Sequence, residues 1–351
     1  MKLTRVLLVA FTFAFLASCT NDDNENVSKG NYDNGVFILN EGNSSGGSVS
    51  FLGDDLTTFK QDVYGAENPG DLAGKYLQNI FFDGDKAYVI AGGSNVINVV
   101  DRYTFKLLAK IETGLITPRY GVVKNGKAYV TNANTYAYAN PATGNTDDFV
   151  AVIDLATNKV ESKINLNATA NRIVLEGDKL YITEPYNSDK VLVVNTVTKA
   201  LETPITVGSS ANTMEVKDGV LYVLASPKGS ASKIVKVKLS DESVTEVVFP
   251  KALTKVGNLD IYGSKIYFTK DTGVYSMDIT AAQPSDKPIF NYVSTSKYGV
   301  MYGFAVQNDR IFIADGGDFA SNSNAYVYSL TGTLQKEITV GVGPNGFYFN
   351  N

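Results

Sequence analysis

The chain has 351 residues and a formal net charge of −5 at pH 7, and its hydrophobic fraction of 44% suffices for a packed core. An acidic chain without runs of Lys and Arg is a poor partner for nucleic acid, because phosphate contacts need clustered positive charge. With no histidine and one cysteine, the sequence cannot build Ser-His-Asp, Cys-His or zinc sites, so we expect no enzyme, metal site or cofactor.

The amino-terminal segment predicts export and lipid attachment. Lys2 and Arg5 precede an apolar run over residues 6–17, which has the length of a signal-peptide core and is too short to span a bilayer. The run ends in Leu16-Ala17-Ser18-Cys19, the pattern of a bacterial lipoprotein signal. We predict a signal peptide over residues 1–18 and lipidation of Cys19, so that the membrane is contacted through the acyl chains only. The alternative is an ordinary signal peptide with a chance cysteine.

Residues 19–33 follow as a polar, acidic segment with little to bury, and we predict a disordered tether there. Acidic residues directly behind the lipidated cysteine resemble the signal that sends lipoproteins of Bacteroidota-type bacteria to the outside of the outer membrane. We therefore expect an outer-membrane lipoprotein that faces the cell exterior. The alternative is a solvated leash that faces the periplasm.

Residues 34–351 contain an internal repeat, a short strand in which one aromatic residue is flanked by aliphatic or β-branched residues. The aromatic stands at positions 37, 88, 129, 181, 222, 267 and 312. The mean interval of about 46 residues is close to that of a four-stranded propeller blade. Polar turns such as Lys124-Asn125-Gly126 precede the copies, and Asn-Gly supplies the positive φ of a two-residue hairpin.

The two ends of the repeat region predict how the ring closes. The first unit begins at its second strand, residues 36–39, and the chain ends with a spare inner strand, residues 345–349. If the tail pairs with residues 36–39, no sheet edge is left bare. The sequence thus predicts an all-β, seven-bladed β-propeller of four-stranded antiparallel blades. An open solenoid would leave its terminal repeats uncapped.

Tyr129-Val130-Thr131-Asn132 spells the YVTN signature, and Asp-x-x-Thr-x-Lys turns recur at residues 101–106 and 154–159. On these motifs the chain resembles the YVTN or YncE-like family of seven-bladed propellers. The absence of tryptophan counts against WD40 and quinone-cofactor propellers. The chain is also similar to propeller lipoproteins of Bacteroidota that hold cobalamin above a TonB-dependent transporter, and to related ones that hold siderophores or haem. The motif specifies the fold better than the ligand.

The resemblance implies a ligand face around the central channel, where loops that enter inner strands meet loops that follow second strands. The entry loops offer Gln78, Arg119, Tyr120, Asn171, Arg172, Asn212, Asn258, Tyr302 and Asn345. The post-strand loops add Glu41, Tyr136, Tyr138, Glu184 and Tyr186. We predict that ligand-binding residues lie among these side chains.

Each group of candidates has a structural alternative. The recurring asparagines suit unusual turn angles or bonds to neighbouring backbone. Arg119 and Arg172 either pair with a ring carboxylate such as Glu184 or clamp carboxylate, phosphate or amide oxygens. Tyr136 and Tyr138, in the irregular loop 132–148, either present a recognition surface or cover their own blade.

A second extended segment, residues 62–75, is long enough to overhang the same face. It offers Glu67, Asn68 and Asp71 as calcium ligands, although their spacing matches no calcium-binding loop.

Three functions compete at this point. The first is a non-catalytic surface lipoprotein that binds a small nutrient at the propeller mouth and passes it to a TonB-dependent transporter, as a monomer or bound to that transporter. The nutrient would be a cobalamin-like corrinoid, otherwise a siderophore or haem. The second is a surface-layer or protein-interaction scaffold, which predicts an exposed apolar patch on the outer rim. The third is a propeller lyase or lactonase, which would need histidine or metal-binding carboxylates at the channel mouth.

Overall fold

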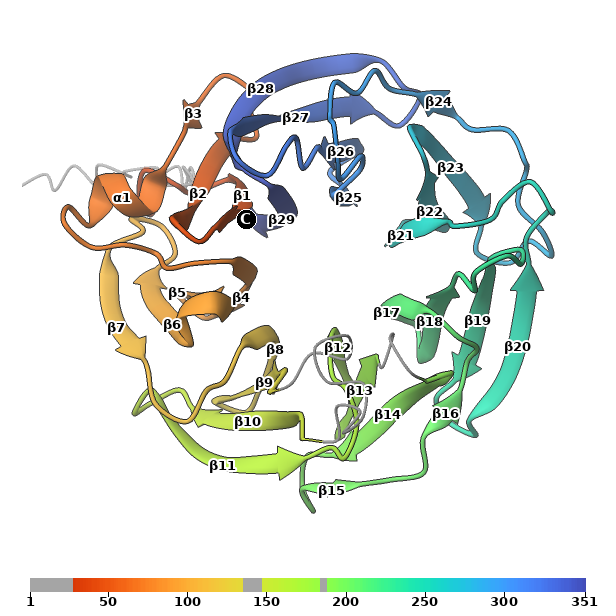
Figure 1. Cartoon of the computed structure of the whole chain (residues 1–351), viewed down its shortest axis with the longest axis horizontal. Coiled ribbons are helices and arrows are strands. Elements are labelled where there is room, and N and C mark those ends of the chain that lie inside the picture. The colour runs from red at the N-terminus through yellow and green to blue at the C-terminus, as the bar shows by residue number, and fades with distance from the viewer. Residues whose placement is uncertain (1–27, 135–146, 184–187) are drawn as a thin grey trace, which may run out of the picture.

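The computed structural model describes residues 28–134, 147–183 and 188–351. They form seven antiparallel sheets arranged radially about one axis, so the predicted all-β propeller is confirmed (Figure 1). Successive sheets are the blades of the ring, numbered here from the amino-terminal one. In each blade the first-named strand below lies innermost.

Blades 1 to 3 contain the following strands. Blade 1 has β29 (Pro344–Asn350), β1 (Gly35–Asn43), β2 (Gly46–Gly53) and β3 (Phe59–Lys60). Blade 2 has β4 (Leu77–Asp83), β5 (Lys86–Ala91), β6 (Val96–Asp101) and β7 (Leu107–Ile111). Blade 3 has β8 (Pro118–Lys124), β9 (Lys127–Asn132), β10 (Phe149–Asp154) and β11 (Lys159–Asn165). Two short helical elements accompany them, α1 (Val63–Glu67) and the 3₁₀ turn η1 (Gly92–Ser94).

Blades 4 to 7 follow the same pattern. Blade 4 has β12 (Ile173–Glu176), β13 (Lys179–Thr183), β14 (Lys190–Asn195) and two outer pieces, β15 (Ala200–Leu201) and β16 (Ile205–Thr206). Blade 5 has β17 (Ala211–Lys217), β18 (Val220–Ala225), β19 (Lys233–Lys238) and β20 (Ser243–Val248). Blade 6 has β21 (Gly257–Tyr262), β22 (Lys265–Lys270), β23 (Gly273–Asp278) and β24 (Phe290–Asn291). Blade 7 has β25 (Gly303–Gln307), β26 (Arg310–Ala314), β27 (Asn322–Ser329) and β28 (Leu334–Val342).

The core lies between the blades rather than within them. Successive side chains of a strand point to opposite faces of its sheet, so each second strand packs against two neighbouring blades. In β1, Phe37 and Leu39 join the cluster shared with blade 2, whereas Val36 and Ile38 join the cluster shared with blade 7. This alternation is why every repeat needs an aliphatic or aromatic residue at three consecutive positions of its second strand.

The carboxyl-terminal strand closes the ring as predicted. Strand β29 pairs antiparallel with β1, with Val36 opposite Phe349 and Ile38 opposite Phe347. The buried Asn350 side chain then fastens the closure. Its Nδ2 donates to the carbonyls of Tyr32 (2.6 Å) and Arg102 (2.9 Å), and its Oδ1 accepts from the Arg102 guanidinium.

The packed part of the chain begins before residue 34, the predicted start of the propeller. Tyr32, which the sequence places in the tether, is 3% exposed and lies in the cluster between blades 1 and 2. Its backbone N–H donates to the Tyr103 carbonyl at 2.9 Å. Residues 1–27, with the signal peptide and Cys19, lie outside the described residues. Where the chain is described, no helix has the length and apolar character needed to cross a membrane.

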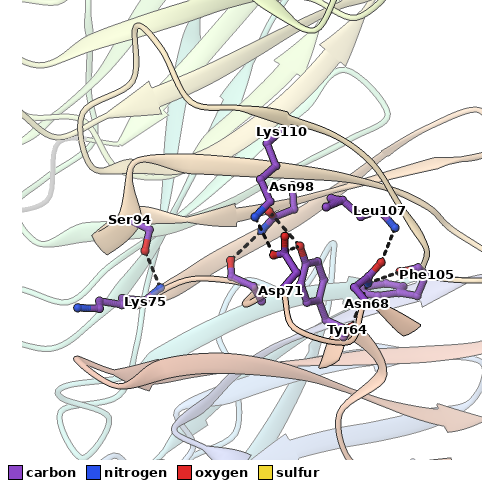
Figure 2. A network of polar contacts seen from close by, with 10 residues as sticks. Tyr64, Asn68, Asp71, Lys75, Ser94, Asn98, Phe105, Leu107 and Lys110 are labelled. Atoms are coloured by element: carbon purple, nitrogen blue, oxygen red, sulfur yellow. Dashed lines mark hydrogen bonds and ion pairs between the residues drawn. The ribbon is translucent and has the colours of Figure 1, made fainter. Parts of the chain in front are cut away.

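The segment between β3 and β4 is held by a network of polar contacts (Figure 2). Asp71 accepts from Lys110 Nζ (2.7 Å) and from the Tyr64 hydroxyl (3.0 Å). Asn68 donates to the carbonyls of Tyr64 and Phe105 and accepts from the Leu107 N–H at 2.7 Å. Glu67 accepts from the Tyr32 hydroxyl at 2.7 Å. The three calcium ligands suggested by the sequence are therefore occupied by protein partners.

Candidate functional site

A cavity of about 890 Å³ lies at the mouth of the propeller, and all seven blades contribute to its lining. Seven predicted ligand-binding residues line it: Arg119, Tyr120, Asn171, Arg172, Asn258, Tyr302 and Asn345. Glu41 and Gln78 line it as well. The predicted residues Tyr136, Tyr138, Glu184 and Tyr186, and the side chain of Asn212, lie outside the described part of the chain. Their roles stay predictions.

Several lining residues were not predicted from the sequence. They are mostly small or apolar: Tyr76, Ser210, Thr213, Leu224, Ser226, Val256, Gly257, Val300 and Met301. Most stand within three residues of a predicted position or its repeat equivalent. A left-handed backbone turn at Tyr76, Ser210 and Met301 (φ between 51° and 59°) lies at the entry to three inner strands. These three residues could have been identified only from a sequence signal for a positive φ, and Tyr, Ser and Met give no such signal.

The threonine of the Tyr-x-Thr repeat positions the entry loops. The Thr131 hydroxyl, in the YVTN motif, donates to the Asn171 carbonyl (2.7 Å) in the next blade and accepts from the Tyr120 N–H (3.2 Å). Thr183 accepts from the Arg172 N–H at 3.0 Å in the equivalent place. The motif thus fixes the backbone of three candidate residues, Tyr120, Asn171 and Arg172.

The entry-loop asparagines link neighbouring blades. Asn345 Nδ2 donates to the Leu77 carbonyl (2.9 Å), and Asn258 Nδ2 donates to the Met301 carbonyl (3.0 Å). Asn258 also has a φ of 51°. The structural interpretation of these asparagines is thus supported in its backbone bonding for both, and in its turn angle for Asn258. The Oδ1 of Asn345 is buried and has no hydrogen-bond partner among the residues described.

One arc of the rim is acidic and comes from blades 7 and 1. Glu41 accepts hydrogen bonds from the Tyr302 hydroxyl and from Gln78 Nε2 (3.2 Å). Burial raises the pKa of the Glu41 carboxyl, and these two bonds and the nearby Arg119 oppose that rise. Burial and the negative charge of Glu41 raise the pKa of Tyr302. The arc therefore offers a carboxyl whose lone pairs are only partly used.

The loop that carries Tyr302 is anchored from below by a buried carboxylate. Asp315 is 1% exposed and accepts from the hydroxyls of Tyr292 and Ser294 (the latter at 2.6 Å). The Met301 N–H donates to the Tyr292 hydroxyl at 3.1 Å. Asp315 thus acts on the site through the position of residues 292–302.

The other arc is basic and comes from blades 3 and 4. The buried Arg119 donates from Nη1 to Asn171 Oδ1 at 3.2 Å. The guanidinium carbon of Arg172 lies 4.9 Å from the centre of the Tyr120 ring, a cation–π distance. Below them Tyr348 accepts from Asn79 Nδ2 at 3.2 Å, and burial raises its pKa.

Deeper along the inner strands of blades 5 and 6 are two buried carboxyls. Glu215 accepts from the Ile261 N–H (2.7 Å), and Asp260 accepts from the Val306 N–H (3.1 Å), each in the following blade. Burial, and next the charge of Asp260, raises the pKa of Glu215 to about 8. Burial raises the pKa of Asp260 to about 7. No group of three or more Cys, Asp or Glu side chains suited to a metal ion occurs in the described residues.

Comparison with known proteins places the chain at the level of family and fold. Residues 34–349 match the model of a domain of unknown function, DUF5074. No curated protein matches the sequence.

Similar solved structures include the following three. A quinonprotein alcohol dehydrogenase-like protein from Bacteroides thetaiotaomicron has 19% identity and a TM-score of 0.68, over 91% of this chain and 79% of that one. Hydrazine synthase from Kuenenia stuttgartiensis has 15% identity and a TM-score of 0.58, over 75% and 86%. The computationally designed protein Ika8 has 10% identity and a TM-score of 0.58, over 92% of each chain. At these identities the likeness concerns the fold alone.

Proposed function

Since the chain belongs to the DUF5074 family, a family of unknown function, we propose its function from the site: non-catalytic binding of a small molecule in the mouth cavity. The observation that carries this proposal is a cavity of about 890 Å³ to which all seven blades contribute and which is lined with amide, phenol, carboxyl, guanidinium and hydroxyl groups. Small-molecule sites typically measure roughly 300–1,000 Å³. A cavity near the upper end of that range suits a bulky ligand.

A corrinoid is the ligand class that we propose first, with haem or a ferric siderophore as the alternatives. A corrinoid carries peripheral amides and a phosphate, which match the Asn, Gln and Arg side chains of the rim. Tyr76, Tyr120 and Tyr302 add aromatic surface beside them. The choice among these ligands rests on the resemblance to cobalamin-capturing propellers, since the family model names no ligand.

We further propose that the protein is an outer-membrane lipoprotein that passes its ligand to a TonB-dependent transporter. Partly exposed apolar side chains border the mouth at Tyr76, Ile116, Val300 and Tyr302, where such a transporter would dock. Among the described residues of the outer strands, the exposed Leu108, Leu201 and Leu334 lie in different blades, whereas Val244 and Val248 both lie on β20. Single exposed residues are ordinary surface, so on these strands only β20 offers the scaffold alternative more than one exposed apolar side chain.

Calorimetric titration of the purified protein with cyanocobalamin, haem and a ferric siderophore tests the binding proposal. We expect saturable binding of one of them with a 1:1 ratio. Glu41→Gln, inside the cavity, should change that affinity, whereas Glu246→Gln, on the outer rim in a pair with Lys233, should not. Heat signals no larger than buffer for all three ligands would refute the proposal.

The transporter step has its own test. Tyr76→Arg at the mouth should prevent co-purification with a TonB-dependent transporter from native membranes, and Leu334→Arg on an outer strand should not. Equal recovery of the transporter with both variants would contradict docking at the mouth.

A further inference from the structure

Arg172 differs from the other arginines that the structure describes, Arg102, Arg119 and Arg310, each of which donates a side-chain hydrogen bond. Within residues 28–134, 147–183 and 188–351, its side chain forms no hydrogen bond and no ion pair, and its Nε is buried without a partner. Partly buried lysines elsewhere have acidic neighbours, as in Lys110–Asp71 (2.7 Å) and Lys179–Glu202 (2.9 Å). Burying a cation without a counter-ion carries a desolvation cost, and in the described chain only the cation–π contact with Tyr120 is seen to offset it for Arg172.

The geometry around Arg172 favours a ligand rather than a purely structural role. Its guanidinium carbon lies over the Tyr120 ring, 4.9 Å from the ring centre, and its backbone N–H donates to the Thr183 hydroxyl. A cation–π contact gives the guanidinium N–H groups no hydrogen-bond acceptor, so they still need one. The residue lines the mouth cavity, so a molecule in the cavity can reach those donors.

The neighbouring Arg119 is in a different situation. It contacts Asn171 at 3.2 Å and lies close enough to Glu41 to oppose the rise of that carboxyl's pKa. The charge of Arg119 is thus balanced by the acidic arc. The two arginines are equivalent candidates in the sequence but differ in the structure. Arg119 is bonded within the rim, whereas the N–H donors of Arg172 remain for a ligand.

The complementary groups lie on the acidic arc. Asn345 Oδ1 is buried without a partner in the described residues, and Glu41 is a half-buried carboxyl in the same cavity lining. Both oxygens are hydrogen-bond acceptors, so N–H donors of a ligand would be their best partners.

We propose that Arg172, stacked on Tyr120, is the anion-binding group of the mouth and takes a phosphate or carboxylate of the ligand through paired N–H bonds. This inference rests on the proposed function and predicts how the ligand is oriented in the cavity. The anionic end lies toward blades 3 and 4, and the N–H donors lie toward Glu41 and Asn345. A neutral molecule of the same size would leave Arg172 buried against an uncharged surface and would bind more weakly.

The test measures binding of two simple anions by calorimetry at constant ionic strength, with the full chain. Pyrophosphate represents the phosphate source and tricarballylate the carboxylate source. We expect saturable binding of at least one, weakened by about 10- to 100-fold in Arg172→Gln. Arg172→Lys keeps the charge without the planar fork and should be intermediate. Lys265→Gln, an exposed cation in the β21–β22 hairpin at the opposite ends of these strands, is the matched control and should bind as the unmodified chain does.

The outcomes separate this inference from the proposed function. If neither anion binds saturably, or if Arg172→Gln binds as tightly as the unmodified chain, the anion site is refuted, whatever the corrinoid titration shows. If the anions bind through Arg172 while cyanocobalamin, haem and siderophore all fail, the anion site stands and the proposed ligand class falls. The melting temperature of Arg172→Gln, measured alongside, confirms that the variant is folded.

Discussion

Replacing Asn350 by alanine should destabilise the whole ring, because this one side chain ties the last strand to two other segments. Its Nδ2 donates to the carbonyls of Tyr32 and Arg102, and its Oδ1 accepts from the Arg102 guanidinium. A neutral hydrogen bond contributes about 0.5–1.5 kcal/mol and one to a charged group about 1.5–3 kcal/mol. Since Asn350 is fully buried, water cannot replace the lost partners.

We therefore expect Asn350→Ala to lower the free energy of unfolding by about 3–5 kcal/mol. With an unfolding entropy of about 2.1 cal/mol/K per residue, this corresponds to a fall of about 4–8 °C in Tm for a domain of this length. Urea unfolding followed by far-UV circular dichroism measures the free energy directly. The control is Asn351→Ala, which changes the exposed neighbour and should leave stability unaltered. If Asn350→Ala lowered the free energy of unfolding by less than about 0.5 kcal/mol, which is within the range of ordinary surface changes, the stabilising role of Asn350 in ring closure would be refuted.

Three further predictions follow from other parts of the molecule. Because burial raises the folded pKa of Glu215 to about 8 and of Asp260 to about 7, their contribution to stability is fully present below about pH 4 and is lost as pH rises through those values. Unfolding free energies measured from pH 5 to 9 should fall by a few kcal/mol, and a Glu215→Gln, Asp260→Asn double variant should flatten the curve; an unchanged slope would contradict this. Thr131→Val removes the hydroxyl that bonds the Asn171 carbonyl, so urea unfolding should show a loss of about 1–2 kcal/mol, and no loss would contradict the role given to the motif. Because Glu67, Asn68 and Asp71 are occupied by protein partners, millimolar calcium or chelator should leave Tm unchanged, and a calcium-dependent rise would show a site there.

Much of the fold could be predicted because each blade must bury both faces of its second strand. The same aromatic and aliphatic pattern therefore recurs seven times in the sequence, as at Tyr129 and Tyr181. The spare inner strand at the carboxyl terminus could be recognised from the sequence as well. The outer strands were harder to predict from the sequence. In blade 4, Pro204 follows the short β15 and precedes β16, so the fourth strand is split, as expected for an edge that need not donate every N–H.

The site could be predicted in part, because the repeat places equivalent residues at the same end of every blade. Arg119, Arg172 and Tyr302 were found by counting back from the second strands. What the sequence could not show is which partner each side chain takes. The division between Arg119, balanced near Glu41, and Arg172, stacked on Tyr120, arises from contacts between blades that are distant in the chain.

The most direct test of the account is a titration of a chain whose mouth cavity has been filled. Gly257 lines the cavity and is exposed, and a Cβ atom added there would meet only Thr269 Oγ1, at 3.7 Å. Gly257→Tyr should therefore fold normally while it occupies the ligand's space. Calorimetry with cyanocobalamin should show 1:1 binding by the unmodified chain and by the control Lys265→Tyr, and binding weakened at least about tenfold by Gly257→Tyr. Equal affinity of all three proteins would contradict the mouth cavity as the binding site.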